Sequence, residues 1–525
     1  MTTSRPTRRT SGAHTVPGSA TPVLREVEHG LVRGVAHPTH SVFYAIPYAA
    51  PPTGLGRFQA PGPHPAWRGI RDASRPGATA PQLPRGQFGP LDVSAYFAPG
   101  WTHGSDYLTV NVWTPPEAPA YAFRQAPVLV FLHGGAFIAG SSYSPLFDGR
   151  GFARDGVVVV SVNYRLGLSG FLDLPSAHPN RGLADVLAAL AWVRRNIAVF
   201  GGDPSKVTLA GHSAGAILTA AALASRQSTG LFQRAIMQSG SGTAAFTPEQ
   251  AATVRETAAK ALGVAPTLDG FAALTDQELL AAVPALAGLD LDTARARDPL
   301  QKISPLGVVL DEQPASAAAR GRTQPVDLLI GHNAEEGNLY LLPSGVMAAT
   351  TLDELRSAAR HAHPDPDRLL AVYSARHPDA TPGELRSIVL GEAAFGAGSR
   401  ALADNHAAAG HNTYAYVFNW RSTALDGRLG STHIVEAPFA FDTLAPELHG
   451  EGRLLGPAPA PQTLADQTHR AWTEFITSGT PGWARYELDR RTTMSIDNEW
   501  APLSDPFAEE RALWTAADAT EQPPS

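Results

Sequence analysis

A serine set between two glycines most constrains how this chain folds; it lies in the run Gly211-His212-Ser213-Ala214-Gly215. The apolar segment 207–210 precedes this run, and the alanine-rich segment 216–224 follows it. The pattern therefore predicts a sharp turn from a strand into a helix, with a strained serine backbone and close neighbours on both sides. Only glycine leaves enough room at the flanking positions. Such a turn is typical of a serine that acts as a nucleophile.

Apolar, β-branched runs alternate with longer helix-prone segments along the chain. This alternation predicts the α/β class, with a doubly wound, mostly parallel central sheet and helices on both faces. Strands are expected at residues 128–132, 157–162, 207–210, 235–237, 326–330 and 414–418, with a helix at 183–197. Residues 248–297 and 350–405 are rich in alanine and leucine and do not fit the alternation. We expect helical insertions there, over the carboxyl ends of the strands, where ligands bind in open α/β sheets.

The 525 residues, of which 43% are hydrophobic and 17% charged, are enough for one large domain with insertions. We expect a disordered tail at 1–21, a single catalytic domain at 22–517 and a C-terminal tail at 518–525. The net charge of −7 favours neither a nucleic-acid nor a membrane-surface partner. No apolar run approaches the roughly 18 residues of a membrane span, and the first residues lack the apolar region of a secretory signal. The expected location is the cytoplasm.

The composition also excludes several kinds of chemistry. The chain has no cysteine, which excludes thiol catalysis, disulfides and thiolate metal sites. Its three lysines are Lys206, Lys260 and Lys302. None follows a glycine, as a phosphate-binding loop of the Gly-Lys-Ser/Thr type requires, and none stands three residues after a serine, as a Ser-x-x-Lys catalyst requires. Histidine is therefore the natural base for an activated serine.

A second small-residue motif, His133-Gly134-Gly135-Ala136-Phe137, follows the strand expected at 128–132. Small consecutive residues leave backbone N–H groups uncovered, and such groups can bind the oxyanion that forms in acyl transfer. Taken alone, the motif is better interpreted as a glycine-rich turn. The serine turn two strands later reverses that preference.

Further motifs are spread along the chain: Ile46-Pro47-Tyr48-Ala49, Pro51-Pro52-x-Gly54, Arg57-Phe58, the run from Leu108 to Trp113, the run from Asn163 to Gly167, the run from Phe200 to Pro204, and Gln238-Ser239-Gly240. With the two motifs above, they resemble the type-B carboxylesterases from about residue 32 to residue 514. This branch of the α/β-hydrolases includes the cholinesterases and the bacterial para-nitrobenzyl esterases. The resemblance implies an α/β-hydrolase fold.

The resemblance also implies a catalytic triad. Ser213 matches the nucleophile, Glu336 the acid and His433 the base. The order serine, acid, histidine along the chain is the order that an α/β-hydrolase requires. Glu335 is the alternative acid, because it stands next to Glu336 after the strand expected at 326–330, and Glu436 is expected to have a structural role.

The activity implied is hydrolysis of small to medium carboxylic esters through an acyl-enzyme. The N–H groups of Gly135, Ala136 and Ala214 would bind the oxyanion, and no metal or cofactor would be needed. The expected partner is a small-molecule ester, and the chain would act as a monomer or dimer. Two alternatives remain: a carbamate or amide hydrolase with the same triad, and a non-catalytic adhesion or binding protein on the same fold.

The sequence departs from the family at three places. The two cysteines that the family bridges across the loop at 80–107 are replaced, so we expect packing to hold this loop and the loop to be more mobile. The family's Glu-Asp-Cys-Leu becomes Ser105-Asp106-Tyr107-Leu108, which removes the acidic partner expected for Arg57. Ala136 replaces a glycine, as in members that accept esters of bulky, even tertiary, alcohols.

Overall fold

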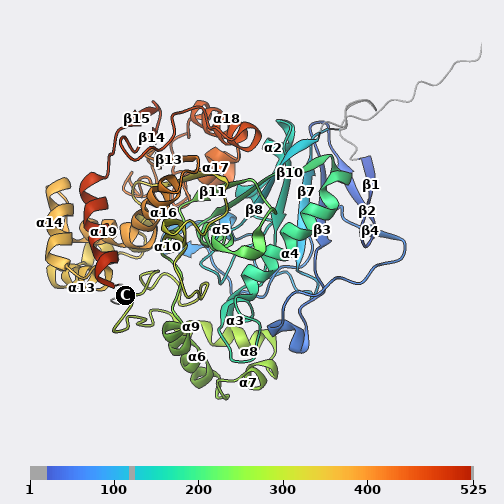
Figure 1. Ribbon diagram of the computed structural model, residues 1–525, viewed down its shortest axis with the longest axis horizontal. Coiled ribbons are helices and arrows are strands. Elements are labelled where there is room, and N and C mark those ends of the chain that lie inside the picture. The colour runs from blue at the N-terminus through green and yellow to red at the C-terminus, as the bar shows by residue number, and fades with distance from the viewer. Residues whose placement is uncertain (1–20, 117–124, 522–525) are drawn as a thin grey trace, which may run out of the picture.

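The computed structural model describes residues 21–116 and 125–521 (Figure 1). The tail expected at 1–21 lies outside these residues except for Thr21, which is the first residue of strand β1. At the other end, helix α19 (Ala508–Glu521) continues four residues into the segment expected as a tail from residue 518. The C-terminal tail expected at 518–525 stays a prediction, and residues 522–525 lie outside the description.

One sheet of 13 strands crosses the molecule in the order β1-β2-β3-β7-β9-β8-β10-β11-β12-β13-β14-β15, and β4 pairs with β2. The seven strands from β9 to β14 are parallel to one another, and the pairs at both ends of the sheet are antiparallel. The bounds are β1 (Thr21–Val27), β2 (Gly30–Ala36), β3 (Ser41–Pro47), β4 (Ile70–Asp72), β7 (Thr109–Thr114), β8 (Ala126–Leu132), β9 (Val158–Val162), β10 (Gly202–His212), β11 (Arg234–Gln238), β12 (Asp327–Asn333), β13 (Thr413–Phe418), β14 (Thr493–Ile496) and β15 (Ala501–Leu503). All six expected strands are confirmed.

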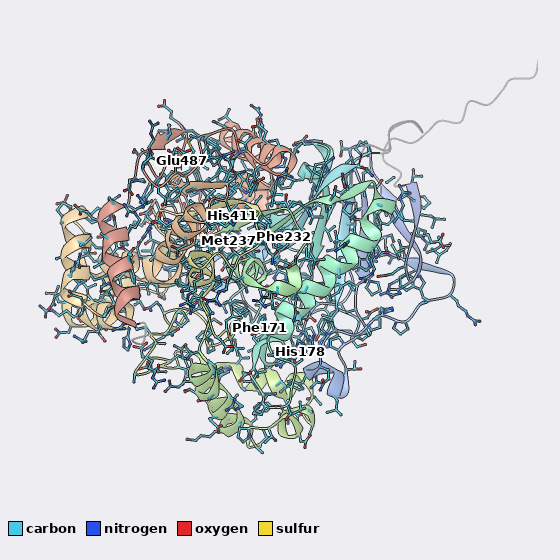
Figure 2. The ribbon with its side chains drawn as sticks, in the orientation of Figure 1. Phe171, His178, Phe232, Met237, His411 and Glu487 are labelled. Atoms are coloured by element: carbon cyan, nitrogen blue, oxygen red, sulfur yellow. The ribbon has the colours of Figure 1, made fainter. Side chains whose placement is uncertain are left out.

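Both faces of the sheet are covered, because successive side chains of a strand point to opposite faces. On β8, Val130 faces the core that α4 and α5 complete, whereas Phe131 faces the core that α17 and α18 complete. Met237 of β11, labelled in Figure 2, is fully buried in the first of these cores. The bounds are α4 (Arg181–Asn196), α5 (Ala214–Ala224), α17 (Ala437–Ala440) and α18 (Gln462–Ser478). The expected doubly wound architecture is confirmed.

The segment 248–297 contains α6 (Pro248–Leu262), α7 (Leu268–Ala272), α8 (Asp276–Ala281) and α9 (Val283–Leu286), at the lower edge of Figure 1. Helix α8 contacts α3 (Gly167–Phe171), which follows the carboxyl end of β9. The segment 350–405 contains α13 (Leu352–Ala362), α14 (Pro366–Arg376) and α15 (Pro382–Gly391), at the left of Figure 1, and then α16 (Ala397–Ala408). Helices α13 to α15 share a small core with α19. Helix α16 instead packs on β12 and β13, so it is a crossover helix of the sheet and not part of an insertion.

Shorter elements connect these layers. Strands β5 (Gln87–Phe88) and β6 (Leu91–Asp92) form a separate hairpin. The short helices are α1 (Ser94–Phe97), α2 (Arg150–Arg154), α10 (Pro314–Ala319), α11 (Asn338–Leu341) and α12 (Val346–Ala349), with a π-helical turn η5 (Glu392–Gly396) before α16. Among the described helices, none combines the length and the apolar character needed to cross a membrane.

The loop at 80–107 is held by polar contacts as well as by packing. The side-chain amide of Gln82 bonds both backbone groups of Gly140, at 3.0 and 2.8 Å. Ser141 Oγ donates to the carbonyl oxygen of Ala98 (2.8 Å), and Arg453 pairs with Asp92. The hydrogen bonds of Gln82 and Ser141 tie the loop to the segment after β8, and the pair with Arg453 ties it to the segment before α18. The expected mobility of the loop stays a prediction.

Arg57 has an acidic partner, contrary to the expectation from the sequence. Its Nε lies 3.1 Å from Asp276 Oδ1 on α8, and its Nη1 donates to the carbonyl oxygen of Leu274 (2.6 Å). The carboxylate comes from the first helical insertion, more than two hundred residues away, which is why the local motif did not reveal it.

Candidate active site

Ser213 stands between β10 and α5 in a strained backbone conformation, with φ 57° and ψ −122°. A Cβ atom on Gly211 would lie 2.2 Å from the carbonyl oxygen of Gly215, and one on Gly215 would lie 2.1 Å from the carbonyl oxygen of Leu132. Any side chain at either position would therefore force the strand and helix apart. Both glycines are required for the turn that presents the serine.

The imidazole of His433 joins Ser213 to a carboxylate. Its Nε2 lies 2.8 Å from Ser213 Oγ, and its Nδ1 lies 2.5 Å from Glu336 Oε2. All three side chains are buried. With Glu336 ionised, Nδ1 donates to the carboxylate, which leaves Nε2 to accept the serine hydroxyl. Glu335 points elsewhere: it pairs with Arg421 and accepts the backbone N–H of Ser431.

The three residues come from neighbouring parts of the sheet. Ser213 directly follows β10, and Glu336 follows β12, where the backbone N–H of Asn333 donates to Glu336 Oε1 (2.7 Å). His433 lies in the loop after β13, and its ring stacks on Phe395 at 4.6 Å. The group therefore forms at the carboxyl ends of parallel strands, where open α/β sheets bind their ligands.

The motif at 133–137 lies against the serine turn. A Cβ atom on Gly134 would lie only 2.9 Å from Ser213 Cβ. Each of the five carbonyl oxygens of the motif accepts a hydrogen bond. The His133 carbonyl accepts from Tyr164 Oη, that of Gly134 from His133 Nδ1, and that of Gly135 from the N–H of Ala139. The Ala136 carbonyl accepts from Ser304 Oγ, and that of Phe137 from the N–H of Gly167. Because its carbonyls are tied down, the loop is fixed before any substrate arrives.

The N–H groups of this loop remain available. Within residues 21–116 and 125–521, those of Gly135 and Ala136 donate to no protein acceptor. Ala214 is the first residue of α5, so its N–H has no carbonyl partner inside the helix. One pocket is lined by Gly135, Ala136, Ser213 and His433, so two of the three expected oxyanion donors lie around the same space as the serine.

The sequence model of the carboxylesterase family matches residues 21–514. The chain belongs to this family. It is 33% identical to the para-nitrobenzyl esterase of Bacillus subtilis (strain 168) over 503 residues, which cover 92% of this chain and 96% of that protein. It is 31% identical to the phenmedipham hydrolase of Pseudarthrobacter oxydans over 482 residues, or 88% and 92% of the two chains.

A crystal structure of a carboxylesterase from Geobacillus stearothermophilus superposes on this chain with a TM-score of 0.80 at 31% identity. The match covers 94% of this chain and 99% of that one. These findings confirm the α/β-hydrolase fold and the expected class, a serine hydrolase that acts on carboxylic esters. They do not favour the carbamate, amide or non-catalytic alternatives.

In this carboxylesterase, burial resists charge on both members of the His433–Glu336 pair. Burial raises the pKa of Glu336 to about 7, and the nearby Glu436 carboxylate adds to the effect. Burial also lowers the pKa of His433 well below its usual value; His212 lowers it further, whereas Glu436 opposes the change. The two groups titrate as a unit. The lowered pKa of His433 keeps its imidazole uncharged near neutral pH, so the ring can accept a proton.

A second buried histidine–glutamate pair lies beside the first. His212 Nε2 is 3.2 Å from Glu436 Oε1, and His212 Nδ1 is 2.8 Å from Tyr96 Oη. Asn333 Nδ2 donates to Glu436 Oε2 at 2.6 Å. Burial opposes ionisation of Glu436, but His212 and Asn333 outweigh it and hold the pKa of that carboxyl below its usual value. Glu436 is thus the structural residue that the sequence indicated.

The sequence analysis missed His212 and Tyr96. The position of His212 next to the serine was a usable signal, because a titratable side chain there must lie near the nucleophile. Tyr96 gave no such signal, since it reaches the site from α1 of a long loop, more than one hundred residues before the serine.

The pocket in front of Ser213 is mainly apolar. Its walls are formed by six apolar or aromatic side chains, Phe88, Tyr96, Phe97, Leu339, Tyr340 and Ile434, and by Arg85. Tyr340 also borders a cavity of about 470 Å³ that Lys302, His361 and Arg386 help to line. The larger cavity of about 780 Å³ lies behind Glu336 and is lined by neither Ser213 nor His433. Ser213 therefore opens onto the apolar pocket, which has a volume of about 20 Å³, and onto neither of these two larger cavities.

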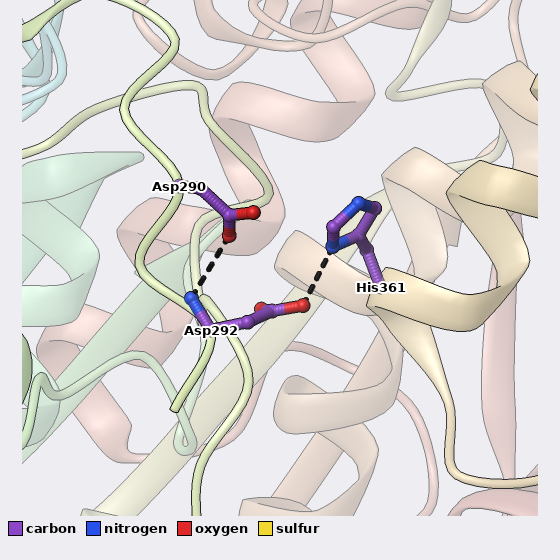
Figure 3. Close-up of side chains that lie close together, drawn as sticks. All are labelled: Asp290, Asp292 and His361. Atoms are coloured by element: carbon purple, nitrogen blue, oxygen red, sulfur yellow. Dashed lines mark hydrogen bonds and ion pairs between the residues drawn. The ribbon is translucent and has the colours of Figure 1, made fainter. Parts of the chain in front are cut away.

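Asp290, Asp292 and His361 lie close together (Figure 3), and His361 also lines the 470 Å³ cavity. Their ligand atoms lie within 4.8 Å of one another, close enough to share a metal ion. Both aspartates are exposed, however, and Asp292 Oδ2 already lies 2.6 Å from His361 Nδ1. The contact between Asp292 and His361 therefore connects the segment 248–297 to helix α13.

Proposed function

We propose that this esterase hydrolyses small to medium carboxylic esters through a covalent intermediate on Ser213. The hydrogen-bonded series Ser213–His433–Glu336, with its distances of 2.8 and 2.5 Å, carries the proposal. A serine hydroxyl is a weak nucleophile until a neighbouring base takes its proton. The 2.8 Å contact between His433 Nε2 and Ser213 Oγ supports His433 as this base, and so does burial, which holds the pKa of His433 below its usual value.

In the first step, His433 Nε2 takes the proton of Ser213 Oγ as that oxygen attacks the ester carbonyl carbon. The carbonyl oxygen becomes an oxyanion, which the N–H groups of Gly135, Ala136 and Ala214 stabilise. His433 then gives the proton to the alkoxy oxygen, and the alcohol leaves.

In the second step, His433 takes a proton from water, whose oxygen attacks the acyl-enzyme. A second oxyanion forms and collapses, the proton returns to Ser213 Oγ, and the carboxylic acid leaves. Throughout, Glu336 orients the imidazole and stabilises its positive charge while the proton is held.

The proposal extends to residues 22–517 as one catalytic domain that uses no metal or cofactor and binds no nucleic acid. We further propose a cytoplasmic monomer or dimer. Sedimentation of the purified chain gives its mass in solution, and a chelator should leave its turnover unchanged. Fractionation of source cells should recover the esterase activity with the cytoplasmic fraction; activity in the membrane or external fraction would contradict this location.

The first experiment is hydrolysis of para-nitrophenyl butyrate by the wild type and by Ser213→Ala. Release of para-nitrophenol by the wild type alone supports the proposal. Equal release by both proteins would exclude Ser213 as the nucleophile. Small to medium acyl chains have roughly two to eight carbons. A folded wild type that hydrolyses no para-nitrophenyl ester with roughly two to eight acyl carbons would overturn the proposed substrate class.

A further inference from the structure

Arg85 lies in the wall of the pocket in front of Ser213, and its side chain is half-buried. The carbon of its guanidinium is 5.6 Å from the ring centroid of Phe97 and 5.9 Å from that of Phe88. Among the residues that the structure describes, Arg85 forms no ion pair and no hydrogen bond. Apart from these two aromatic rings, its charge has no ionic or hydrogen-bonding partner among the described residues.

Other buried arginines of this chain are satisfied. Arg165 bonds Asp185 through two nitrogens, and Arg400 pairs with Glu392. Arg181 donates to four backbone carbonyls. This is the usual condition, because removing a charge from water is costly unless a partner replaces the water. Arg85 departs from it at the place where a substrate binds.

The pocket holds no carboxylate that competes for Arg85. Apart from His433, the other described side chains that line it are uncharged. The titratable groups that interact electrostatically with Arg85 are the phenols of Tyr340 and Tyr96, and burial raises the pKa of both, so they stay neutral. Burial lowers the pKa of Arg85, but an arginine remains charged in a protein. The pocket is therefore positive.

The cavity beyond Tyr340 is different. Lys302 and Arg386 line it together with the carboxyl groups of Asp298 and Glu354. Mixed charges of this kind do not select an anion. Selection of a negative group therefore depends on Arg85, close to the reacting serine.

We propose that Arg85 binds a carboxylate carried by the substrate, so that this esterase prefers anionic esters, such as half-esters of dicarboxylic acids, over their neutral counterparts. This inference rests on the proposed esterase function. The guanidinium offers a planar pair of N–H donors that matches a carboxylate, and such charge-assisted bonds are strongest where water is excluded. The aromatic walls provide that exclusion.

The test compares two substrate pairs. The first pair, para-nitrophenyl hydrogen glutarate and para-nitrophenyl pentanoate, places the carboxylate on the acyl side. The second pair, para-carboxyphenyl butyrate and phenyl butyrate, places it on the alcohol side. For each pair, the ratio of kcat/KM for the anionic ester to that for the neutral ester is measured in the wild type and the variants. The two esters of a pair differ in intrinsic reactivity, but this difference is the same in every protein. It therefore cancels when the ratio of a variant is divided by the ratio of the wild type.

The variants are Arg85→Met, which keeps an apolar stem without the charge, and Arg85→Lys, which keeps a charge. Arg194→Gln is the control for net charge, since Arg194 is exposed on α4 and has no ion pair among the described residues. We expect Arg85→Met to lower the ratio about 10- to 100-fold for at least one pair, mainly through KM, as loss of a charged hydrogen bond does. Arg85→Lys should restore part of the ratio, and Arg194→Gln should leave it unchanged.

The pair that responds identifies the side of the substrate that carries the carboxylate. A ratio that Arg85→Met does not change in either pair would overturn the inference, and so would an equal loss for anionic and neutral esters, which would indicate that Arg85 only packs against Phe88 and Phe97. Neither result would affect the proposed esterase function. That function fails separately, if the wild type hydrolyses none of the four esters.

Discussion

Two buried histidine–glutamate pairs lie side by side in this esterase. The rings of His433 and His212 are 5.0 Å apart, and each ring faces its own carboxylate, Glu336 or Glu436. The pairs differ in what the second ring nitrogen meets. The Nε2 atom of His433 contacts the hydroxyl of Ser213, which lines a pocket. The Nδ1 atom of His212 instead contacts the buried phenol of Tyr96. Under the proposed mechanism, the same two residue types therefore take part in catalysis in one pair and have a structural role in the other.

The two pairs are also connected. The backbone N–H of Asn333 bonds Glu336, and its side-chain amide bonds Glu436. Glu436 raises the pKa of Glu336, and His212 lowers the pKa of His433, although burial is the larger cause of both changes. The supporting pair therefore helps to set the orientation and the protonation of the catalytic pair.

Removing the nucleophile should have the largest effect. Ser213→Ala should lower kcat by about 10⁶, as removal of a triad serine does elsewhere. Steady-state hydrolysis of para-nitrophenyl butyrate measures this loss. Ser239→Ala is a matched control, because the Ser239 hydroxyl is buried beside Glu436 without reaching His433. This hydroxyl also bonds Glu336 and lowers the pKa of that carboxyl, so we expect the control to lose some activity, but far less than Ser213→Ala. A control that loses as much activity as Ser213→Ala would contradict the difference between the pairs.

Replacing the carboxylates should separate their roles. Glu336→Gln should lower kcat about 10³- to 10⁴-fold, because an amide cannot stabilise the imidazolium and favours the wrong tautomer. Glu335→Gln should change kcat by less than about tenfold, because Glu335 pairs with the exposed Arg421 at the surface. The same assay ranks the two. The opposite ranking would assign the acid to Glu335.

The sequence predicted the sheet and the catalytic group better than the surroundings of that group. The strands were visible because parallel strands buried on both faces are continuous apolar runs, as in β8 and β9. Ser213 lies in a motif that specifies its local backbone, whereas Glu336 and His433 were assigned through the resemblance to the family. The partner of Arg57 and the contact of Tyr96 with His212 depend on where distant loops pack, and no local pattern records that. Arg85 is missed for the same reason.

Breaking the supporting pair should affect stability more than chemistry. Glu436→Gln removes the charge that His212 faces, and we expect it to lower the free energy of unfolding by about 1–3 kcal/mol at neutral pH. It should lower kcat much less than Glu336→Gln does. Urea denaturation of the variant and the wild type measures the difference in stability.

The stability effect of Glu436→Gln should depend on pH. The folded pKa of Glu436 lies below its usual value, so the carboxylate adds stability above the unfolded pKa and loses it as the pH falls through the folded pKa. The difference between wild type and variant should therefore shrink in acid. A difference that grows as the pH falls would contradict a stabilising charge at this position.

The smallest effect expected is a change in the pH dependence of catalysis. Catalysis needs an uncharged His433 beside an ionised Glu336. Burial lowers the pKa of His433 and raises the pKa of Glu336 to about 7, so kcat/KM of the wild type should rise with pH to a plateau above neutral pH. His212→Gln removes a neighbour that lowers the pKa of His433 and leaves the Glu436 carboxylate, which raises it. The rising limb should therefore move to higher pH, by up to about one pH unit. A limb that stays in place, or moves to lower pH, would show that His212 acts on His433 only through packing, and the two pairs would then be neighbours without electrostatic coupling.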